Sequence, residues 1–226
     1  MRPRYLTKGS THRETMTNYY HSQSWLYDAT RWAFLYGRQQ LLEKLDIRPG
    51  DRVLEIGCGT GANFAAIQSR LKNGGELIGV DCSAPMLRKA SDRVRQQGWT
   101  NVRLLDMEYG RETITRGKAD VVVFSYSLSM VKDWELALAC AHSELWPGGR
   151  IGVVDFCKAP RSSNWFAEWL SMNHVHVDRP YGQKLRRLFG ERAHLQYHAW
   201  AGLWSFYLFV GERSGFQMNQ AAGSAA

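Results

Sequence analysis

A run of small residues, from Gly57 to Gly61 in the motif Glu55 to Gly61, has the composition of a loop that holds a ligand against its backbone. It follows the apolar segment Arg52 to Ile56, which has the pattern of a buried strand. Glycines at a strand-to-helix turn let the backbone approach a ligand closely and adopt torsions that side chains disfavour. The run therefore predicts a ligand-binding loop. Because Gly57, Gly59 and Ala62 also satisfy the fingerprint of nicotinamide-dependent oxidoreductases, the loop alone leaves the ligand open.

Three acidic residues stand where successive strands are expected to end. Glu55 precedes the glycine loop, Asp81 follows the segment 76–80 at the spacing of an acid that binds a ribose, and Asp106 follows the segment 102–105. Taken singly, Asp81 could cap the following helix and Asp106 could begin a turn. Open α/β sheets bind ligands at the carboxyl ends of their strands, so the joint placement favours one shared site.

The glycine loop and the three acids together resemble the class I S-adenosylmethionine-dependent methyltransferases, over about residues 25–156 and the terminal hairpin. The resemblance implies that Glu55 helps to hold the amino-acid end of S-adenosylmethionine, that Asp81 binds the ribose hydroxyls and that Asp106 binds the adenine amino group. It also implies that Met107 lies beside the adenine and that S-adenosylhomocysteine is the product. The other cofactor-binding residues expected are Tyr27, Arg31, Gly57, Cys58, Gly59, Gly61, Cys82, Met86 and Ser125.

A second, shorter resemblance concerns the methyl acceptor. The segments Tyr27 to Arg31 and Phe34 to Arg38 are similar to the N-terminal signature of bacterial lipid N-methyltransferases, above all the BtaB-type betaine-lipid enzymes. Those enzymes trimethylate the homoserine amine of diacylglyceryl-homoserine, so the resemblance implies a lipid head-group amine as acceptor. A phosphatidylethanolamine N-methyltransferase and a soluble small-molecule amine methyltransferase stay open as alternatives. A nucleic-acid methyltransferase fits less well, because the segment Ser125 to Leu128 lacks the Asn/Asp-Pro-Pro-Tyr-type motif of base-amine methylases.

The acceptor site needs groups that bind an amine or accept its proton. Tyr126 follows the fourth expected strand and is the first catalytic candidate, with a ring that suits a cationic product. Tyr27 is expected to close over the cofactor, and Arg31, on the neighbouring helical turn, to pair with a carboxylate. His174 is a candidate base, although two histidines so close together, at 174 and 176, are more often surface or packing residues. The expected substrate-binding residues are Tyr20, Arg31, Tyr126, Arg179 and Tyr181, and the sequence implies no metal.

The elements that must position these residues alternate along the chain. Strands are predicted over residues 52–56, 76–80, 102–105, 119–125 and 150–156, helices over 62–71, 85–97 and 134–145, and a turn over 147–149. This alternation implies parallel βαβ units, and two last strands over 194–199 and 204–210 predict an antiparallel hairpin at the sheet edge. The predicted fold is α/β and Rossmann-like, the class I methyltransferase fold with a mostly parallel seven-stranded sheet and a C-terminal antiparallel hairpin.

A chain of 226 residues fits one domain. Within it we expect an N-terminal helical cap over 1–45, a cofactor-binding core over 50–156 and an insertion over 157–193 whose best helical candidate is 163–175. The terminal hairpin is expected over 194–212, and the residues 215–226 have the composition of a disordered tail.

Composition narrows the partners and the location. The net charge of +8 indicates an anionic partner, and aromatic residues interleaved with basic ones near the N-terminus suit an anionic membrane surface. No apolar run is long enough to span a membrane and the N-terminus lacks the pattern of a signal peptide, so we expect a cytoplasmic protein, with peripheral association on the inner face of the membrane left open. Four scattered cysteines indicate reduced thiols. No stable nucleic-acid complex is expected, and the sequence makes no prediction of oligomeric state.

Overall fold

The computed structural model describes residues 36–72, 74–158, 175–199 and 204–214. The predictions made for Tyr20, Tyr27, Arg31 and His174 lie outside these residues, as do most of the N-terminal cap, the helix candidate 163–175 and the tail. They stay predictions.

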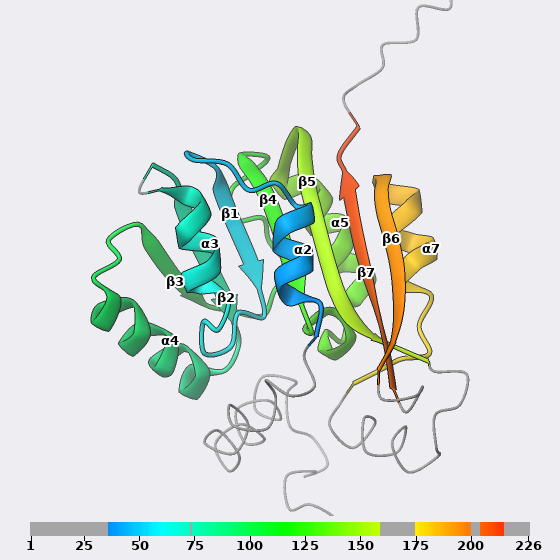
Figure 1. Ribbon diagram of the computed structural model, residues 1–226, viewed down its shortest axis with the longest axis horizontal. Coiled ribbons are helices and arrows are strands. Elements are labelled where there is room, and N and C mark those ends of the chain that lie inside the picture. The colour runs from blue at the N-terminus through cyan, green and yellow to red at the C-terminus, as the bar shows by residue number, and fades with distance from the viewer. Residues whose placement is uncertain (1–35, 73, 159–174, 200–203, 215–226) are drawn as a thin grey trace, which may run out of the picture.

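A seven-stranded sheet forms the centre of the molecule (Figure 1). Its strands follow the order β3-β2-β1-β4-β5-β7-β6, with all neighbours parallel except the pairs β5–β7 and β6–β7. The strands are β1 (Arg52–Ile56), β2 (Glu76–Asp81), β3 (Val102–Asp106), β4 (Ala119–Ser125), β5 (Leu145–Cys157), β6 (Gly190–Ala199) and β7 (Trp204–Glu212). The predicted sheet and its terminal antiparallel hairpin are confirmed.

Helices cover both faces of the sheet, so the described part has three layers (Figure 1). Buried side chains of α2 (Arg38–Lys44), α3 (Phe64–Leu71) and α4 (Ala84–Gln97) share one apolar cluster with residues such as Val53 and Val154 of the sheet. The opposite cluster contains side chains of α5 (Trp134–Glu144) and α7 (Tyr181–Leu188). Buried apolar strands with helices on both faces are what a parallel sheet requires.

Two boundaries differ from those predicted. The turn expected at 147–149 lies inside β5, which begins at Leu145, because Gly148 and Gly149 exchange backbone hydrogen bonds with Arg213 after β7. Strand β6 already begins at Gly190, ahead of His194, and helix α7 precedes it, so the segment between β5 and β6 is shorter than the 157–193 insertion. Tyr181, Leu185 and Leu188 of α7 have helical spacing, but eight residues are fewer than the window over which such periodicity indicates a helix.

Three predictions of absence can be compared with the described residues. Among them, no helix is long and apolar enough to cross a membrane. No group of His, Cys, Asp and Glu side chains within the same residues could hold a metal ion. All four cysteines lie in described segments, and each is a free thiol.

Candidate functional site

The glycine loop turns sharply at the carboxyl end of β1 and is fixed to both neighbouring strands. The N–H groups of Gly57 and Cys58 both donate to the carbonyl of Val80 on β2, at 2.8 and 3.0 Å. On the other side the Ser127 hydroxyl donates to the Ile56 carbonyl at 2.6 Å. A Cβ on Gly57 would lie 2.4 Å from the Ser127 Cβ, so only glycine allows the segment after β4 to pack this closely on the loop.

Gly59 has the opposite surroundings. Its φ of 56° lies in the left-handed region, and an added Cβ would meet no atom within 4 Å. Its N–H donates to a carboxylate oxygen of Asp81 at 2.8 Å, so Asp81 holds the loop open. The space on this side of the loop is where a bound molecule could approach the backbone.

The second and third predicted acids lie side by side. Asp81 and Asp106 are paired residues in the parallel register of β2 and β3, and the Met107 N–H donates to the Asp81 carbonyl at 3.1 Å. Asp106 is exposed, whereas burial raises the pKa of the Asp81 carboxyl, against hydrogen bonds from the backbone N–H groups of Ser83 and Gly59 that lower it. The nearby Cys82 is half-buried and Met86 is buried.

Glu55 is the least completely paired acid at this edge. The side chain is 2% exposed, and its Oε1 accepts a hydrogen bond from Asn63 Nδ2 at 2.7 Å, but within the described residues its Oε2 has no partner. Burial raises the pKa of this carboxyl to about 7, against the lowering effects of the Asn63 hydrogen bond and the nearby Arg38 charge. A buried carboxylate oxygen without a donor is costly unless a ligand supplies one.

Further polar atoms lack partners in the same part of the molecule. The hydroxyl oxygens of Ser83, after β2, and Ser125, at the end of β4, are buried and have no partner among the described residues. With Glu55 they mark the carboxyl ends of β1, β2 and β4. The hydroxyls of Tyr109 and Tyr207 also lack partners among the described residues, within the apolar cluster on the α5 and α7 face. The group at the carboxyl ends differs from these because it contains a carboxylate, which suits a polar ligand.

Arg38 was not assigned to the site by the sequence, although it ends the stretch from Phe34 that resembles lipid N-methyltransferases. It is the first residue of α2, and its guanidinium lies within electrostatic range of Glu55 and Tyr126. Burial lowers the pKa of this guanidinium, which stays charged. A cation beside a carboxylate with one unpaired oxygen suits a zwitterion that carries both an ammonium and a carboxylate.

Tyr126 lies directly after β4, as predicted, in an unusual backbone conformation. Its φ is 55°, a left-handed value that costs a residue other than glycine about 1 kcal/mol or more. Its hydroxyl donates to the Tyr36 carbonyl at 2.6 Å, and its ring packs 4.8 Å from that of Phe156.

Aromatic rings gather next to Tyr126, and the sequence did not predict this grouping. We call them the aromatic cluster: Tyr36, Tyr126, Phe156, Trp204 and Phe206. The centroid of the Trp204 ring lies 5.7 Å from that of Tyr36 and 6.0 Å from that of Phe156. Tyr36 is 49% exposed while the other four are buried, so the cluster reaches the surface at Tyr36. Its members come from distant parts of the chain.

The other two predicted substrate-binding residues in the described part lie elsewhere. Arg179 donates to the Val131 carbonyl at 2.7 Å. The hydroxyl of Tyr181 donates to the carbonyl of His176 at 2.9 Å, and its buried ring belongs to the apolar cluster on the α5 and α7 face. The structure therefore brings Glu55, the glycine loop, Asp81, Asp106 and Tyr126 together, and leaves Arg179 and Tyr181 with structural partners.

The strand order, the glycine loop after β1 and the acids that end β2 and β3 define the class I methyltransferases. The chain belongs to the methyltransferase-domain family, whose model matches residues 27–199. Membership of this family confirms the predicted class, S-adenosylmethionine-dependent methyltransferases, and the oxidoreductase alternative is set aside.

Curated relatives differ in what they methylate. Nocamycin O-methyltransferase of Saccharothrix syringae is 30% identical over 62% of this chain and 50% of its own length. A ubiquinone/menaquinone biosynthesis C-methyltransferase of Teredinibacter turnerae is 29% identical over 66% of this chain and 62% of its own length. Phosphoethanolamine N-methyltransferase 1 of Zea mays is 26% identical over 66% of this chain and 30% of its own length. The matches thus span less than two thirds of these relatives.

Solved structures show the same fold. A phosphoethanolamine N-methyltransferase 2 of Haemonchus contortus, in complex with S-adenosylmethionine, superposes with a TM-score of 0.74 at 15% identity, over 92% of this chain and 61% of its own. A geranyl diphosphate C-methyltransferase of Streptomyces coelicolor superposes with a TM-score of 0.67 at 17% identity, over 78% of this chain and 75% of its own.

Proposed function

We propose that this protein transfers methyl groups from S-adenosylmethionine to the amine of a small polar head group of the ethanolamine or homoserine type. The observation that carries the proposal is Tyr36, the exposed ring of the aromatic cluster, which lies two residues before Arg38 at the start of α2. An amine that gains methyl groups becomes a permanent cation, and cations bind favourably over aromatic faces. Carbon and oxygen acceptors give neutral methylated groups, which lack this cation–π attraction.

The residues at the carboxyl edge fit the cofactor. Glu55 Oε2 can accept a hydrogen bond from the ammonium of its amino-acid end, Arg38 can pair with its carboxylate, and the open side of Gly59 leaves room for close approach. Asp81 and Asp106 are paired in the register of β2 and β3, and they are the expected partners of the ribose and the adenine. Met107, Cys82 and Met86 are their neighbours along the chain. When bound, S-adenosylmethionine supplies an electrophilic methyl group on a sulfonium.

The site must also align the acceptor amine with the methyl group and remove a proton from the amine. An amine must be neutral to attack, so a nearby group has to accept its proton directly or through water. The Tyr126 hydroxyl keeps its proton in the hydrogen bond to the Tyr36 carbonyl, so its role here is to orient the amine, while Tyr27 and His174 remain predictions. Most of the acceleration would come from holding the amine close to the methyl group and in line with it.

The finer prediction, trimethylation of diacylglyceryl-homoserine at a membrane surface, rests on the resemblance of residues 27–38. Only Tyr36, Gly37 and Arg38 of that stretch are described, so support for the lipid acceptor and for peripheral membrane association comes from the sequence alone. The names of the phosphoethanolamine N-methyltransferases favour an amine acceptor, and equally allow a water-soluble head group.

The test is transfer of labelled methyl groups from S-adenosylmethionine to a panel of acceptors, with products resolved by mass spectrometry. The panel contains phosphoethanolamine, diacylglyceryl-homoserine vesicles, phosphatidylethanolamine vesicles and soluble amines, with a quinol and a phenol for C- and O-methylation. We expect N-methylated head groups, and vesicle products alone would support the lipid version. Label only in the quinol or the phenol would contradict the proposal and favour the activities named for the C- and O-methyltransferase relatives.

A further inference from the structure

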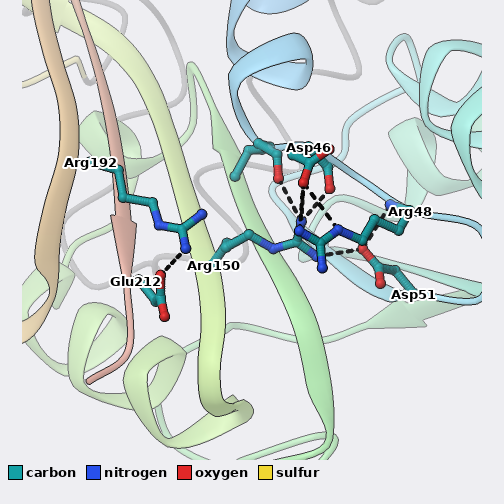
Figure 2. Close-up of polar contacts among 7 residues, drawn as sticks. Asp46, Arg48, Asp51, Arg150, Arg192 and Glu212 are labelled. Atoms are coloured by element: carbon teal, nitrogen blue, oxygen red, sulfur yellow. Dashed lines mark hydrogen bonds and ion pairs between the residues drawn. The ribbon is translucent and has the colours of Figure 1, made fainter. Parts of the chain in front are cut away.

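Arg150 is a buried cation at the amino edge of the sheet, far from the proposed reaction. It lies near the start of β5, and its side chain is 7% exposed. The guanidinium donates to Asp51 Oδ2 at 2.6 Å, to the Leu45 carbonyl at 3.0 Å and to the Asp46 carbonyl. Figure 2 shows this side chain reaching from β5 to the Asp46 and Asp51 region. Three acceptors from one short segment therefore converge on one side chain.

These contacts fix the C-terminal end of helix α2. Leu45 is the C-cap residue of α2, and Asp46, directly after it, has a φ of 49°. A left-handed residue that is not glycine needs outside contacts to hold its conformation, and Arg150 provides them. The helix end also packs tightly on β5, since an added Cβ on Gly152 would lie 2.6 Å from a Leu45 methyl carbon.

The N-terminal end of α2 is fixed in a similar way at the carboxyl edge. The Tyr126 hydroxyl donates to the carbonyl of Tyr36, which directly precedes the helix cap Gly37. Gly37 lies so close to the sheet that an added Cβ would lie 2.6 Å from the Phe206 ring. A helix of seven residues is too short to be stable alone, so these end contacts, together with the buried Leu41 and Leu42, determine its position.

We propose that Arg150 is a positioning residue for the amino-acid end of the S-adenosylmethionine site, and that it acts through α2 by fixing where Arg38 stands relative to Glu55. Arg38 is the first residue of α2, so a shift or rotation of the helix moves its guanidinium directly. Glu55 lies on the sheet and does not follow such a shift. This inference rests on the proposed function, since it concerns how well that cofactor site is assembled.

The test is a double-mutant cycle on S-adenosylmethionine binding, measured by calorimetry on the full chain with Arg150→Met, Arg38→Met and the double variant. We expect Arg150→Met to weaken binding about tenfold, in the range of ordinary coupling free energies. In the Arg38→Met background the same change should have little further effect, because the group through which Arg150 acts is absent. The matched control is Arg192→Met, which removes an arginine of the same charged region whose ion pair is with Glu212.

The outcomes separate the inference from the proposed function. Wild-type protein that binds no S-adenosylmethionine contradicts the proposed function itself. If the wild-type protein binds, two results would overturn the positioning role. One is an equal affinity for S-adenosylmethionine in Arg150→Met and Arg192→Met. The other is an equal loss of affinity on Arg150→Met with and without Arg38. Arg150→Lys, which keeps the charge and loses the planar fork, should bind with intermediate affinity, and it takes the place of Arg150→Met in the cycle if that variant does not fold.

Discussion

The carboxyl edge and the amino edge of the sheet contain similar polar side chains, but these side chains are paired to different degrees. At the amino edge a hollow of about 350 Å³ is lined by charged residues and by Trp146. There Arg48 pairs with Asp46 at 2.8 Å, Arg150 with Asp51 at 2.6 Å, and Arg192 with Glu212 (Figure 2). At the carboxyl edge Glu55 keeps one oxygen without a partner among the described residues, and the hydroxyls of Ser83 and Ser125 do the same.

Whether polar side chains are paired distinguishes structural residues from ligand-binding ones more clearly than their charge or burial does. Paired charges join segments of the chain, as Arg150 joins β5 to the end of α2. Buried polar groups that lack a partner cost stability in the ligand-free protein, and they persist where a ligand completes them. The amino edge is therefore expected to respond to substitution mainly with a loss of stability, and the carboxyl edge mainly with a loss of binding.

The largest effect should come from Gly59→Val at the carboxyl edge. A branched side chain would fill the open side of the loop, and we expect S-adenosylmethionine binding to fall by about a hundredfold or more, measured by calorimetry. Gly98→Val is the matched control: Gly98 has a φ of 66°, and a Cβ there also meets no atom within 4 Å. Both variants carry the same backbone strain, so an equal loss of affinity in both would contradict a ligand at Gly59.

At the amino edge, Arg150→Met should lower the free energy of unfolding by about 3 kcal/mol. The substitution leaves the carboxylate of Asp51 buried without its cation, which is the expensive way to break a buried ion pair. The Arg192 side chain is 49% exposed, so Arg192→Met should lower the free energy of unfolding by less than about 1 kcal/mol. Urea unfolding followed by circular dichroism checks both, and equal losses would mean that Arg150 has no special role in joining α2 to β5.

At the carboxyl edge, Glu55→Gln should stabilise the ligand-free protein at pH 8 while it weakens cofactor binding. The folded-state pKa of about 7 lies above the usual value of 4.5, so the folded state holds its proton more tightly than the unfolded state does. Stability contributed by this group is present below pH 4.5 and is lost as the pH rises to about 7. Glutamine removes that loss, on the order of 3 kcal/mol at pH 8. Urea unfolding at pH 8 measures this. If Glu55→Gln is less stable than wild type, the Glu55 carboxylate has adequate hydrogen-bond partners in the ligand-free protein.

The smallest effect is expected at the rim of the aromatic cluster. Tyr36→Leu removes an exposed ring while the backbone carbonyl that accepts from Tyr126 is kept. Cation–π contacts at exposed sites are worth about 0.5–1 kcal/mol, so the KM for the amine acceptor should rise a few-fold while S-adenosylmethionine affinity is unchanged. Steady-state kinetics with the preferred acceptor measures this, and an unchanged KM would place the amine away from Tyr36.

The sequence predicted the part of the site that follows from strand order. Glu55, Asp81 and Asp106 could be placed together because Asp81 and Asp106 end strands and Glu55 stands one residue before the end of another, and parallel strands bring their carboxyl ends to one edge. Arg38 and the aromatic cluster could not, because their positions depend on how α2 and the β5–β7 pair pack, and no local pattern encodes those contacts. Arg179 and Tyr181 were assigned from residue type alone, and in the structure both bond to backbone carbonyls.

The most direct test of the central claim, that the unpaired oxygen of Glu55 receives the ammonium of S-adenosylmethionine, is the pH dependence of cofactor affinity in wild type and Glu55→Gln. Because Glu55 must be ionised to bind a cation, calorimetry should show wild-type affinity that is about tenfold weaker at pH 6 than at pH 8. Glu55→Gln should bind weakly at both pH values with little difference between them. Equal wild-type affinity at pH 6 and pH 8, or a Glu55→Gln variant that binds as tightly as wild type, would contradict the account.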